Sequence, residues 1–325
     1  MRTRRQDLKE RLEELEAMKS RSLSEEVRIG IRAALGDKDN LVAAKAASLA
    51  KHFRLADLLP DLQAAYRQFL SGPREKDKLC LAKEAAIAAL DALEDFEEEL
   101  FLHAAGYVQL EHAYGGPVDT AGPLRVAGCR ALARIGSAEL FFVLADRLTD
   151  PEVDVRFAAA QILAGFCDER AELLLRMKAL AGDSHPRIIG ECFRSLMALH
   201  PQRSFPFVLN YLEAPQGEIA EEAMMAMGES RHPQAFHLLS RMFALAADPE
   251  QREALISAIS LLRTKEALHF LLSAVTEEPL PQAQVAVDAL SLYHLEETEV
   301  VWLMTMVISR GSQPLIERCA KLTGL

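Results

Sequence analysis

Aromatic side chains are scarce in this sequence of 325 residues. Phe, Tyr and Trp together make up 6% of it, and Trp302 is the single tryptophan. Half of the positions are nevertheless hydrophobic, with only 16 glycines and 14 prolines, which excludes a disordered or collagen-like chain. Alanine and leucine fill most of the apolar positions, and this composition predicts helices and little β-structure.

Paired cysteines, a leader and long apolar runs are also missing. The cysteines are odd in number and show no CxxC spacing, which argues against a disulfide scaffold or a zinc knuckle, and we expect all of them to be small buried helix residues: Cys80, Cys129, Cys167, Cys192 and Cys319. The charged stretch after Arg2 does not resemble a signal peptide. The apolar segment from Val300 to Ile308 is too short to cross a bilayer. The sequence therefore predicts a cytoplasmic protein with no membrane partner.

Basic residues are fewer than acidic ones: the sequence has 37 Lys and Arg and 48 Asp and Glu, which gives a net charge of −11. Such a surface repels phosphate backbones, so a nucleic-acid partner is disfavoured. The sequence also has no GxGxxG, GxxxxGK[ST], GxSxG or HExxH motif. Nucleotide-binding, esterase and zincin activities therefore have no support in the sequence, and we predict neither a catalytic residue nor a cofactor.

Prolines recur at a spacing of 28 to 35 residues, at Pro123, Pro151, Pro186, Pro215, Pro249, Pro279 and Pro314. Proline is tolerated in the first turn of a helix and excluded from its interior, so regular prolines mark regular helix starts. The segments Asp150-Pro151-Glu152 and Asp248-Pro249-Glu250 each place Asp as an N-cap before the proline. Each interval holds two amphipathic helices. This period predicts an all-α solenoid of about eight helix pairs.

The stretch from Asp150 to Leu163, DPEVDVRFAAAQIL, followed by a second leucine-rich helix, resembles a HEAT-like repeat of the bilin-lyase type. The preceding unit, around Leu124-Arg125-Val126-Ala127, matches it in register, and a partial match lies at Val27-Arg28-Ile29-Gly30. The resemblance implies an armadillo-type superhelix. It also implies a ladder in which an arginine meets an aspartate of the inter-repeat turn, with Asp150 and Arg156 as one rung.

We expect residues 1–21 to form a charged capping helix and residues 22–325 a single solenoid with an irregular insertion at about 106–122. As the resemblance implies, the second helix of each pair would line a concave face. The exposed side chains of that face that we expect to bind a partner are Arg147, Arg176, His237, Arg241 and His269.

Two further segments are candidate sites. The insertion holds residue types suited to a metal or to acid–base chemistry, so it could form a ligand loop from Glu111, His112, Tyr114 and Asp119. A run without a single basic residue could cap a helix or dock a basic partner segment, and consists of Asp91, Glu94, Asp95, Glu97, Glu98 and Glu99.

Some HEAT-like proteins are enzymes, and the sequence can be searched for the motifs that their activities require. Deoxyhypusine hydroxylase binds di-iron through repeated His-Glu dipeptides, whereas none of the nine histidines here precedes Glu. The alkylpurine DNA glycosylases use a basic groove, which the acidic composition disfavours. The leading hypothesis is therefore a non-catalytic scaffold, a monomer or weak dimer, that binds a protein or peptide. The alternative is a lyase-like or hydroxylase-like enzyme, or a small-ligand or metal-binding protein, that uses the insertion.

Overall fold

A computed structural model of the chain describes residues 4–212 and 217–323. Its contacts divide the chain into two compact units, Met1–Ile162 and Leu163–Leu325, and each unit is described here by itself. Both units are built almost entirely of α-helices, and the described part contains nineteen of them together with one two-stranded sheet. No helix among the described residues is long and apolar enough to span a bilayer.

The first unit contains nine helices, the last of which ends just past the unit boundary, three short 3-10 segments and a β-hairpin. They are α1 (Arg4–Lys19), α2 (Glu25–Leu35), α3 (Asn40–His52), η1 (Ala56–Leu58), α4 (Leu59–Ser71), η2 (Arg74–Lys76), η3 (Lys78–Cys80), α5 (Leu81–Ala92), α6 (Glu98–Gly106), β1 (Leu110–Ala113), β2 (Gly116–Asp119), α7 (Gly122–Ile135), α8 (Leu140–Arg147) and α9 (Val153–Leu163).

The second unit, as far as its residues are described, contains helices alone. They are α10 (Glu169–Ala181), α11 (Pro186–Leu199), α12 (Pro201–Leu212), α13 (Glu218–Ser230), α14 (Ala235–Leu245), α15 (Pro249–Leu261), α16 (Lys265–Glu277), α17 (Leu280–Leu290), α18 (Glu297–Arg310) and α19 (Gln313–Thr323).

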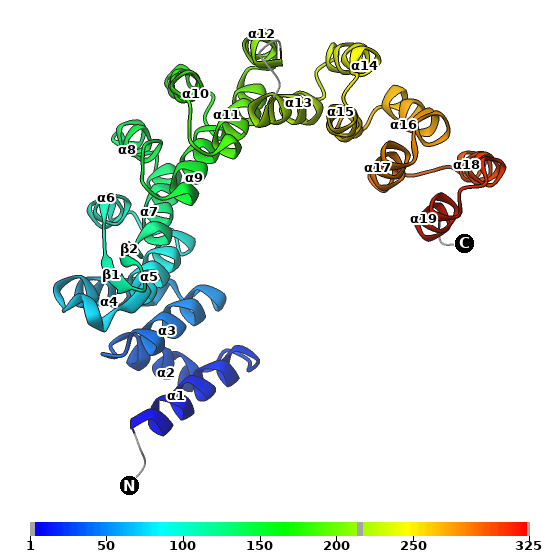
Figure 1. Ribbon diagram of the computed structural model, residues 1–325. Helices are drawn as coiled ribbons and strands as arrows, with labels where there is room; N and C mark the ends of the chain where they lie inside the picture. The colour runs from blue at the N-terminus through cyan, green and yellow to red at the C-terminus, as the bar shows by residue number, and fades with distance from the viewer. Residues whose placement is uncertain (1–3, 213–216, 324–325) are drawn as a thin grey trace. The chain divides into compact units, whose positions relative to one another are not determined.

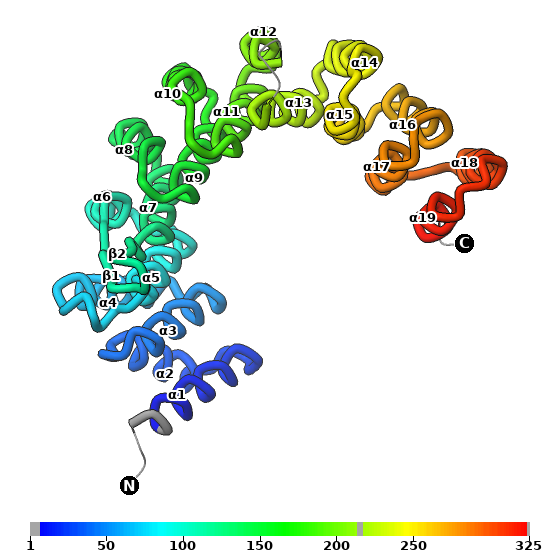
Figure 2. The backbone as a smooth tube through the Cα atoms, viewed as in Figure 1, coloured from blue at the N-terminus to red at the C-terminus, as the bar shows by residue number. Residues whose placement is uncertain are grey.

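Helices alternate between two rows within each unit (Figures 1 and 2). The odd-numbered helices pack directly on one another, α1 on α3, α3 on α5 and α5 on α7 in the first unit, and α11 through α19 in the second. We call them the stacked row. The even-numbered helices pair with them from one side, as α6 does with α7 and α16 with α17, and we call them the flanking row. This alternation is that of an α-solenoid, and the nineteen described helices form nine pairs and the additional helix α1, one pair more than expected.

Two glycines permit the closest contacts between helices. A Cβ atom on Gly128 of α7 would lie 2.5 Å from the backbone nitrogen of Ala105 in α6. A Cβ atom on Gly228 of α13 would lie 2.0 Å from the carbonyl oxygen of Ala258 in α15. Only glycine fits where backbones approach this closely.

The prolines and caps place most helix starts where the sequence predicts them. Asp248 caps α15, its side chain accepting a hydrogen bond from the Gln251 amide at 2.9 Å, and Pro249 is the first helical residue. Pro123, Pro186 and Pro314 lie in the first turns of α7, α11 and α19, and Pro279 is the N-cap of α17. Around Pro151 the helix begins two residues later, at Val153. Pro215 lies outside the described residues.

The N-terminal helix α1 packs on α3, with Leu15 and Met18 buried. The expected cap at residues 1–21 thus corresponds to a helix in the stacked row. That residues 22–325 form one continuous array stays a prediction. The expectation that every cysteine is buried in a helix is wrong for Cys167, which is exposed in the loop after α9. Cys80 is buried but lies in η3.

Candidate functional site

A groove of about 720 Å³ runs over three successive helices of the stacked row in the first unit. Its walls come from α5, α7 and α9, from the end of the hairpin and from Leu79. The polar and charged side chains that line it are Lys51, Glu84, Asp91, Asp119, Thr120, Arg130, Glu152, Asp154 and Gln161.

The three helices present equivalent positions to this groove. Each contributes residues at i, i+4 and i+7, which fall on one helix face. The central position is alanine every time, namely Ala88 in α5, Ala127 in α7 and Ala158 in α9. Small side chains at these positions leave room above the row, and Val126 and Phe157 add apolar surface beside them. The groove therefore has a narrow apolar floor between charged edges.

The loop before α5 shapes one end of the groove. Leu79 and Cys80 both have positive φ, 60° and 54°, which is unfavourable for residues with a Cβ atom. The buried Asp77 side chain compensates, because its two oxygens accept hydrogen bonds from the Ala82 and Lys83 amides at 2.9 and 3.2 Å. Asp77 therefore satisfies two amides in the first turn of α5, whose N-cap residue is Cys80, and the loop turns Leu79 out so that its side chain is 57% exposed at the groove.

The expected irregular insertion is a β-hairpin. Leu110 pairs with Asp119 and Ala113 with Gly116, and the turn relies on Gly115 and Gly116, with φ of 105° and 129°. So short a hairpin is not stable by itself and needs an anchor on the helices. Its strand residues are half-buried or exposed, so that anchor lies at its base.

Buried polar residues form the anchor. The Lys83 ammonium is fully buried and lies 2.9 Å from Asp77 and 3.0 Å from the Gln109 side-chain oxygen. The Glu111 carboxylate accepts hydrogen bonds from the Leu79 amide at 2.6 Å and from Gln109 and Thr120 at 2.8 Å each. Partial burial raises the pKa of Glu111, but these hydrogen bonds outweigh it and hold that pKa below its ordinary value.

Arg125 joins the hairpin to the next repeat. Its guanidinium is 1% exposed and donates to Asp119 at 2.6 Å, to Asp150 at 2.8 Å and to the Tyr107 carbonyl at 2.9 Å. Burial raises the pKa of Asp119, yet the amides of Ala121 and Gln109 and the Arg125 guanidinium together lower it.

Asp150, the turn aspartate of the predicted ladder, binds arginines that precede it in the chain. The Asp150 carboxylate binds Arg125, 25 residues earlier, and Arg147 at 3.3 Å. Arg156 donates to the carbonyl oxygens of Asp150 and Pro151 at 2.7 and 3.0 Å. An arginine and a turn aspartate do meet between repeats, but Arg125 belongs to the helix before the turn.

The predicted ligand loop is divided by the hairpin. Glu111 and Asp119 point inward and are occupied by hydrogen bonds from the chain itself, whereas His112 and Tyr114 are exposed on the hairpin. Within residues 4–212 and 217–323 no group of three or more His, Cys, Asp or Glu side chains is arranged to hold a metal ion. Glu111 and Asp119 therefore belong to the anchor of the hairpin and His112 and Tyr114 to its surface, so the four residues do not form one site.

The five residues expected to bind a partner lie on the flanking row. Within the second unit the stacked row forms the inner side of the curve and the flanking row the outer side, so the assignment of the second helices to a concave face is wrong there (Figure 1). The reason is the phase of the repeat, since the Asp-Pro-Glu motif of residues 248–250 opens a stacked helix, α15, and not the first helix of a pair.

These side chains also differ in exposure. Arg147 donates to the Ala105 carbonyl at 3.1 Å, and Arg176 donates to Glu172 at 2.8 Å and lies over the Phe207 ring, so both are partly buried in internal contacts. His237, Arg241 and His269 are exposed. Their role in binding stays a prediction.

The acidic run is split among three places. Asp91 pairs with Arg134 at 2.6 Å at the end of α5, and the buried Asp95 accepts a hydrogen bond from Gln63 at 2.9 Å. Glu97 is the N-cap residue of α6, and Glu98 and Glu99 lie in its first turn, where the helix dipole favours negative charge. Glu94 is exposed in the intervening loop, with a φ of 63°.

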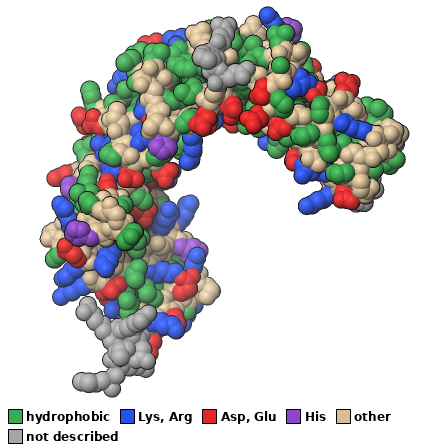
Figure 3. All heavy atoms as spheres, in the orientation of Figure 1, with side chains coloured by type: hydrophobic (Ala, Val, Ile, Leu, Met, Phe, Trp, Pro, Cys, Tyr) green, Lys and Arg blue, Asp and Glu red, His purple; other side chains and the backbone are tan. Residues whose placement is uncertain are grey.

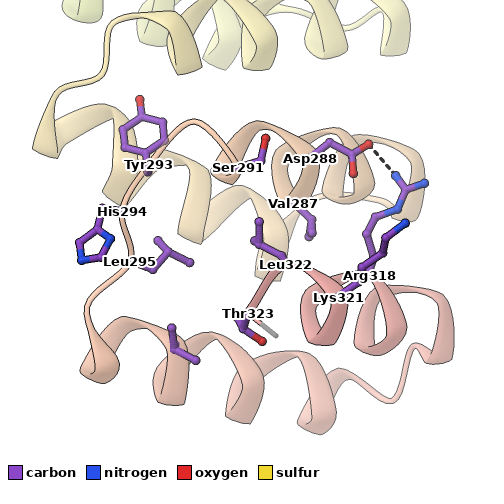
Figure 4. Close-up of a pocket in the computed structure, with 11 residues that line it drawn as sticks. Val287, Asp288, Ser291, Tyr293, His294, Leu295, Arg318, Lys321, Leu322 and Thr323 are labelled. Carbon is purple, nitrogen blue, oxygen red and sulfur yellow. Dashed lines mark hydrogen bonds and ion pairs between the residues drawn. The ribbon is translucent and has the colours of Figure 1, made fainter. Parts of the chain in front are cut away.

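The second unit has a cavity and a cluster of acidic side chains. A cavity of about 740 Å³ lies between α17, α18 and α19, where Arg318 pairs with Asp288 at 2.8 Å (Figure 4). Acidic side chains also gather over α13, but Glu222 there is already paired with Arg194 at 3.0 Å (Figure 3). We assign no ligand to either feature.

No family model and no curated protein matches the sequence. Among solved structures, Kap95p bound to RanGDP matches with a TM-score of 0.52 and 13% identity, over 92% of this chain and 45% of Kap95p, so this chain spans less than half of that protein. Weaker matches are the complex of CpcE and CpcF of phycocyanin lyase from Nostoc sp. PCC7120 (TM-score 0.37, 19% identity, 89% of this chain and 96% of that one) and an engineered protein (0.39, 14%, 97% and 98%). The likeness to Kap95p shows the fold, which is an α-solenoid of the HEAT-repeat type.

Of the residues that line the groove, the sequence predicts only Asp91 and Asp119 as site residues, and it assigns them to other sites. The signal was present, because Ala88, Ala127 and Ala158 hold the same position in three helices, each followed three residues later by a polar side chain. The insertion changes the spacing between the first two, which obscures the repetition. Alanines at helical spacing are typical of an apolar core, and only the arrangement of α5, α7 and α9 around one groove shows that these three face it.

Proposed function

We propose that this chain is a non-catalytic protein-interaction module that binds a segment of a partner protein in the groove over α5, α7 and α9. The observation that carries this proposal is the groove itself, in which three equivalent helix faces offer an apolar floor between charged edges. A segment lying across successive repeats gains many small contacts at once. The HEAT-type fold supports a protein partner, and Kap95p, which shares it, is described bound to RanGDP.

The buried polar groups at the base of the hairpin support this assignment because they have a structural role and are not available to a ligand. Glu111, Asp119 and Arg125 bind one another or the backbone, so they hold the wall of the groove in place. A rigid support of this kind lowers the entropic cost of ordering a bound segment.

Photocrosslinking in the native host tests the proposal. A benzophenone amino acid replaces Arg130, an exposed residue of the groove, or Arg241, an exposed residue of α14 that the sequence analysis favoured. We expect a covalent adduct with a protein from Arg130 and none from Arg241. An adduct from Arg241 alone would move the binding surface to the flanking row, and adducts from neither position would count against the groove.

A further inference from the structure

Glu84 is the side chain that the groove leaves without a partner. It extends from the first turn of α5 into the groove and is half-buried there. Within the described part of the chain, no side chain or amide lies within hydrogen-bonding or ion-pair distance of its carboxylate. Burial raises the pKa of Glu84, and the more distant Lys51 offsets this only in part. A carboxylate removed from water without a partner loses free energy that a bound cation would restore.

The other charges of the groove differ from Glu84 in their surroundings. Asp91 and Asp119 are neutralised by Arg134 and Arg125. Glu152 stands on the opposite wall, where its side chain passes 3.7 Å from the position of a Cβ atom on Gly122. Two cations also line the groove.

Those cations, Lys51 and Arg130, are exposed and therefore hydrated. A hydrated cation needs no partner, whereas a half-buried carboxylate does. The desolvated charge in the groove is therefore negative, and it lies beside the apolar floor formed by Ala88, Ala127 and Ala158.

We propose that the segment bound in this groove carries a lysine or arginine between small or apolar residues, and that its cation pairs with the Glu84 carboxylate. The inference rests on the proposed function, because it specifies the chemistry of the partner segment for the same groove. Small neighbours are required since the floor lies directly beneath the segment. The pairing is stronger than an exposed ion pair because one partner is already half removed from water.

A peptide selection on the full-length chain tests this specificity. A phage-displayed library of random 16-residue peptides is selected on the protein, and the enriched peptides are synthesised and titrated by fluorescence anisotropy. The groove is blocked by Ala92→Trp, at an exposed lining residue that ends α5. The matched control is Ala181→Trp, at an exposed alanine that ends α10. The charge variant is Glu84→Gln, and its control is Glu139→Gln, at an exposed glutamate outside the groove.

We expect enriched peptides with a fixed Lys or Arg, whose binding is lost in Ala92→Trp and kept in Ala181→Trp. Glu84→Gln should weaken binding about tenfold, in the range of a charged hydrogen bond, while Glu139→Gln leaves it unchanged. Replacing the peptide cation with norleucine should cost the same factor, and the two changes together should cost no more than either alone.

Two results would overturn the inference in distinguishable ways. The pairing would be refuted by peptides whose binding is weakened by Ala92→Trp but not by Glu84→Gln. It would also be refuted by peptides that need no cation for binding. Either result would leave the groove as the binding site. Failure to obtain any peptide whose binding Ala92→Trp weakens would refute the groove and the pairing together.

Discussion

At the scale of single residues, the first unit depends on buried side-chain ions that are paired with charges of opposite sign. Arg125 reaches carboxylates on both sides of α7, and Lys83 is enclosed by Asp77 and Gln109. Burying such charges is costly, so their contribution is the defined position that they impose on the hairpin and on the turn at Asp150. The loss of one partner leaves the others buried without compensation.

Arg125→Ala should therefore destabilise the first unit by about 3 to 5 kcal/mol, the usual cost of leaving buried carboxylates unpaired. Denaturant unfolding followed by circular dichroism measures the change. Arg318→Ala is the control, since Arg318 and Asp288 form an exposed pair, with side chains 42% and 63% exposed, for which about 0 to 1 kcal/mol is expected. Equal effects of the two substitutions would contradict the structural role of Arg125.

The depressed pKa of Asp119 predicts a loss of stability in acid. The unfolded chain protonates this carboxyl near its ordinary pKa of about 3.9, and the folded chain only at lower pH. Between the two values the unfolded state binds more protons, so the free energy of unfolding falls as pH drops. Asp119→Asn should flatten this part of the profile when unfolding is measured from pH 6 down to pH 2. Profiles of identical slope would refute the assignment.

At the scale of secondary-structure elements, backbone contact between helices decides how the rows pack. α7 lies against α6 so closely that a Cβ atom on Gly128 would meet backbone atoms of both Ala105 and Phe101, at 2.5 and 2.8 Å. Backbone atoms cannot rotate away as a side chain would, so the helices would have to move apart.

Gly128→Ala should accordingly destabilise the protein by about 1 to 3 kcal/mol, the cost of overpacking, although alanine is the better helix former. Gly122→Ala in the same helix is the matched control. There the added Cβ atom would lie 3.6 Å from a side-chain methyl of Val155, an ordinary contact, so stability should be unchanged or slightly higher. Thermal unfolding of both variants makes the comparison. Unchanged stability of Gly128→Ala would show that α6 can move away from α7 without cost.

At the scale of the whole molecule, each repeat is stabilised by its neighbours, and both units carry more acidic than basic residues. The first unit has 23 basic and 27 acidic residues and the second has 14 and 21, so neither offers a net positive surface to a polyanion. Among the described residues, the pair α18 and α19 packs on the preceding pair, α16 and α17.

Unfolding of this chain of 325 residues should therefore not be a single two-state transition. Trp302 lies in α18 and is the only tryptophan, so fluorescence reports on the pair α18 and α19 while far-ultraviolet circular dichroism reports on all helices. We expect the fluorescence midpoint at lower denaturant concentration than the midpoint by circular dichroism. Coincident transitions would indicate that the two units unfold together.

The sequence by itself determined the class of fold, because the signals involved are local. An N-cap such as Asp248 and a proline such as Pro249 act within one turn, and the apolar spacing of a helix is set within the helix itself. Only the tertiary structure decided which helices stack and what faces the groove. The pairing of Arg125 with Asp150, the close approach at Gly128 and the unpartnered Glu84 depend on residues of separate helices, whose positions follow from packing rather than from any local preference.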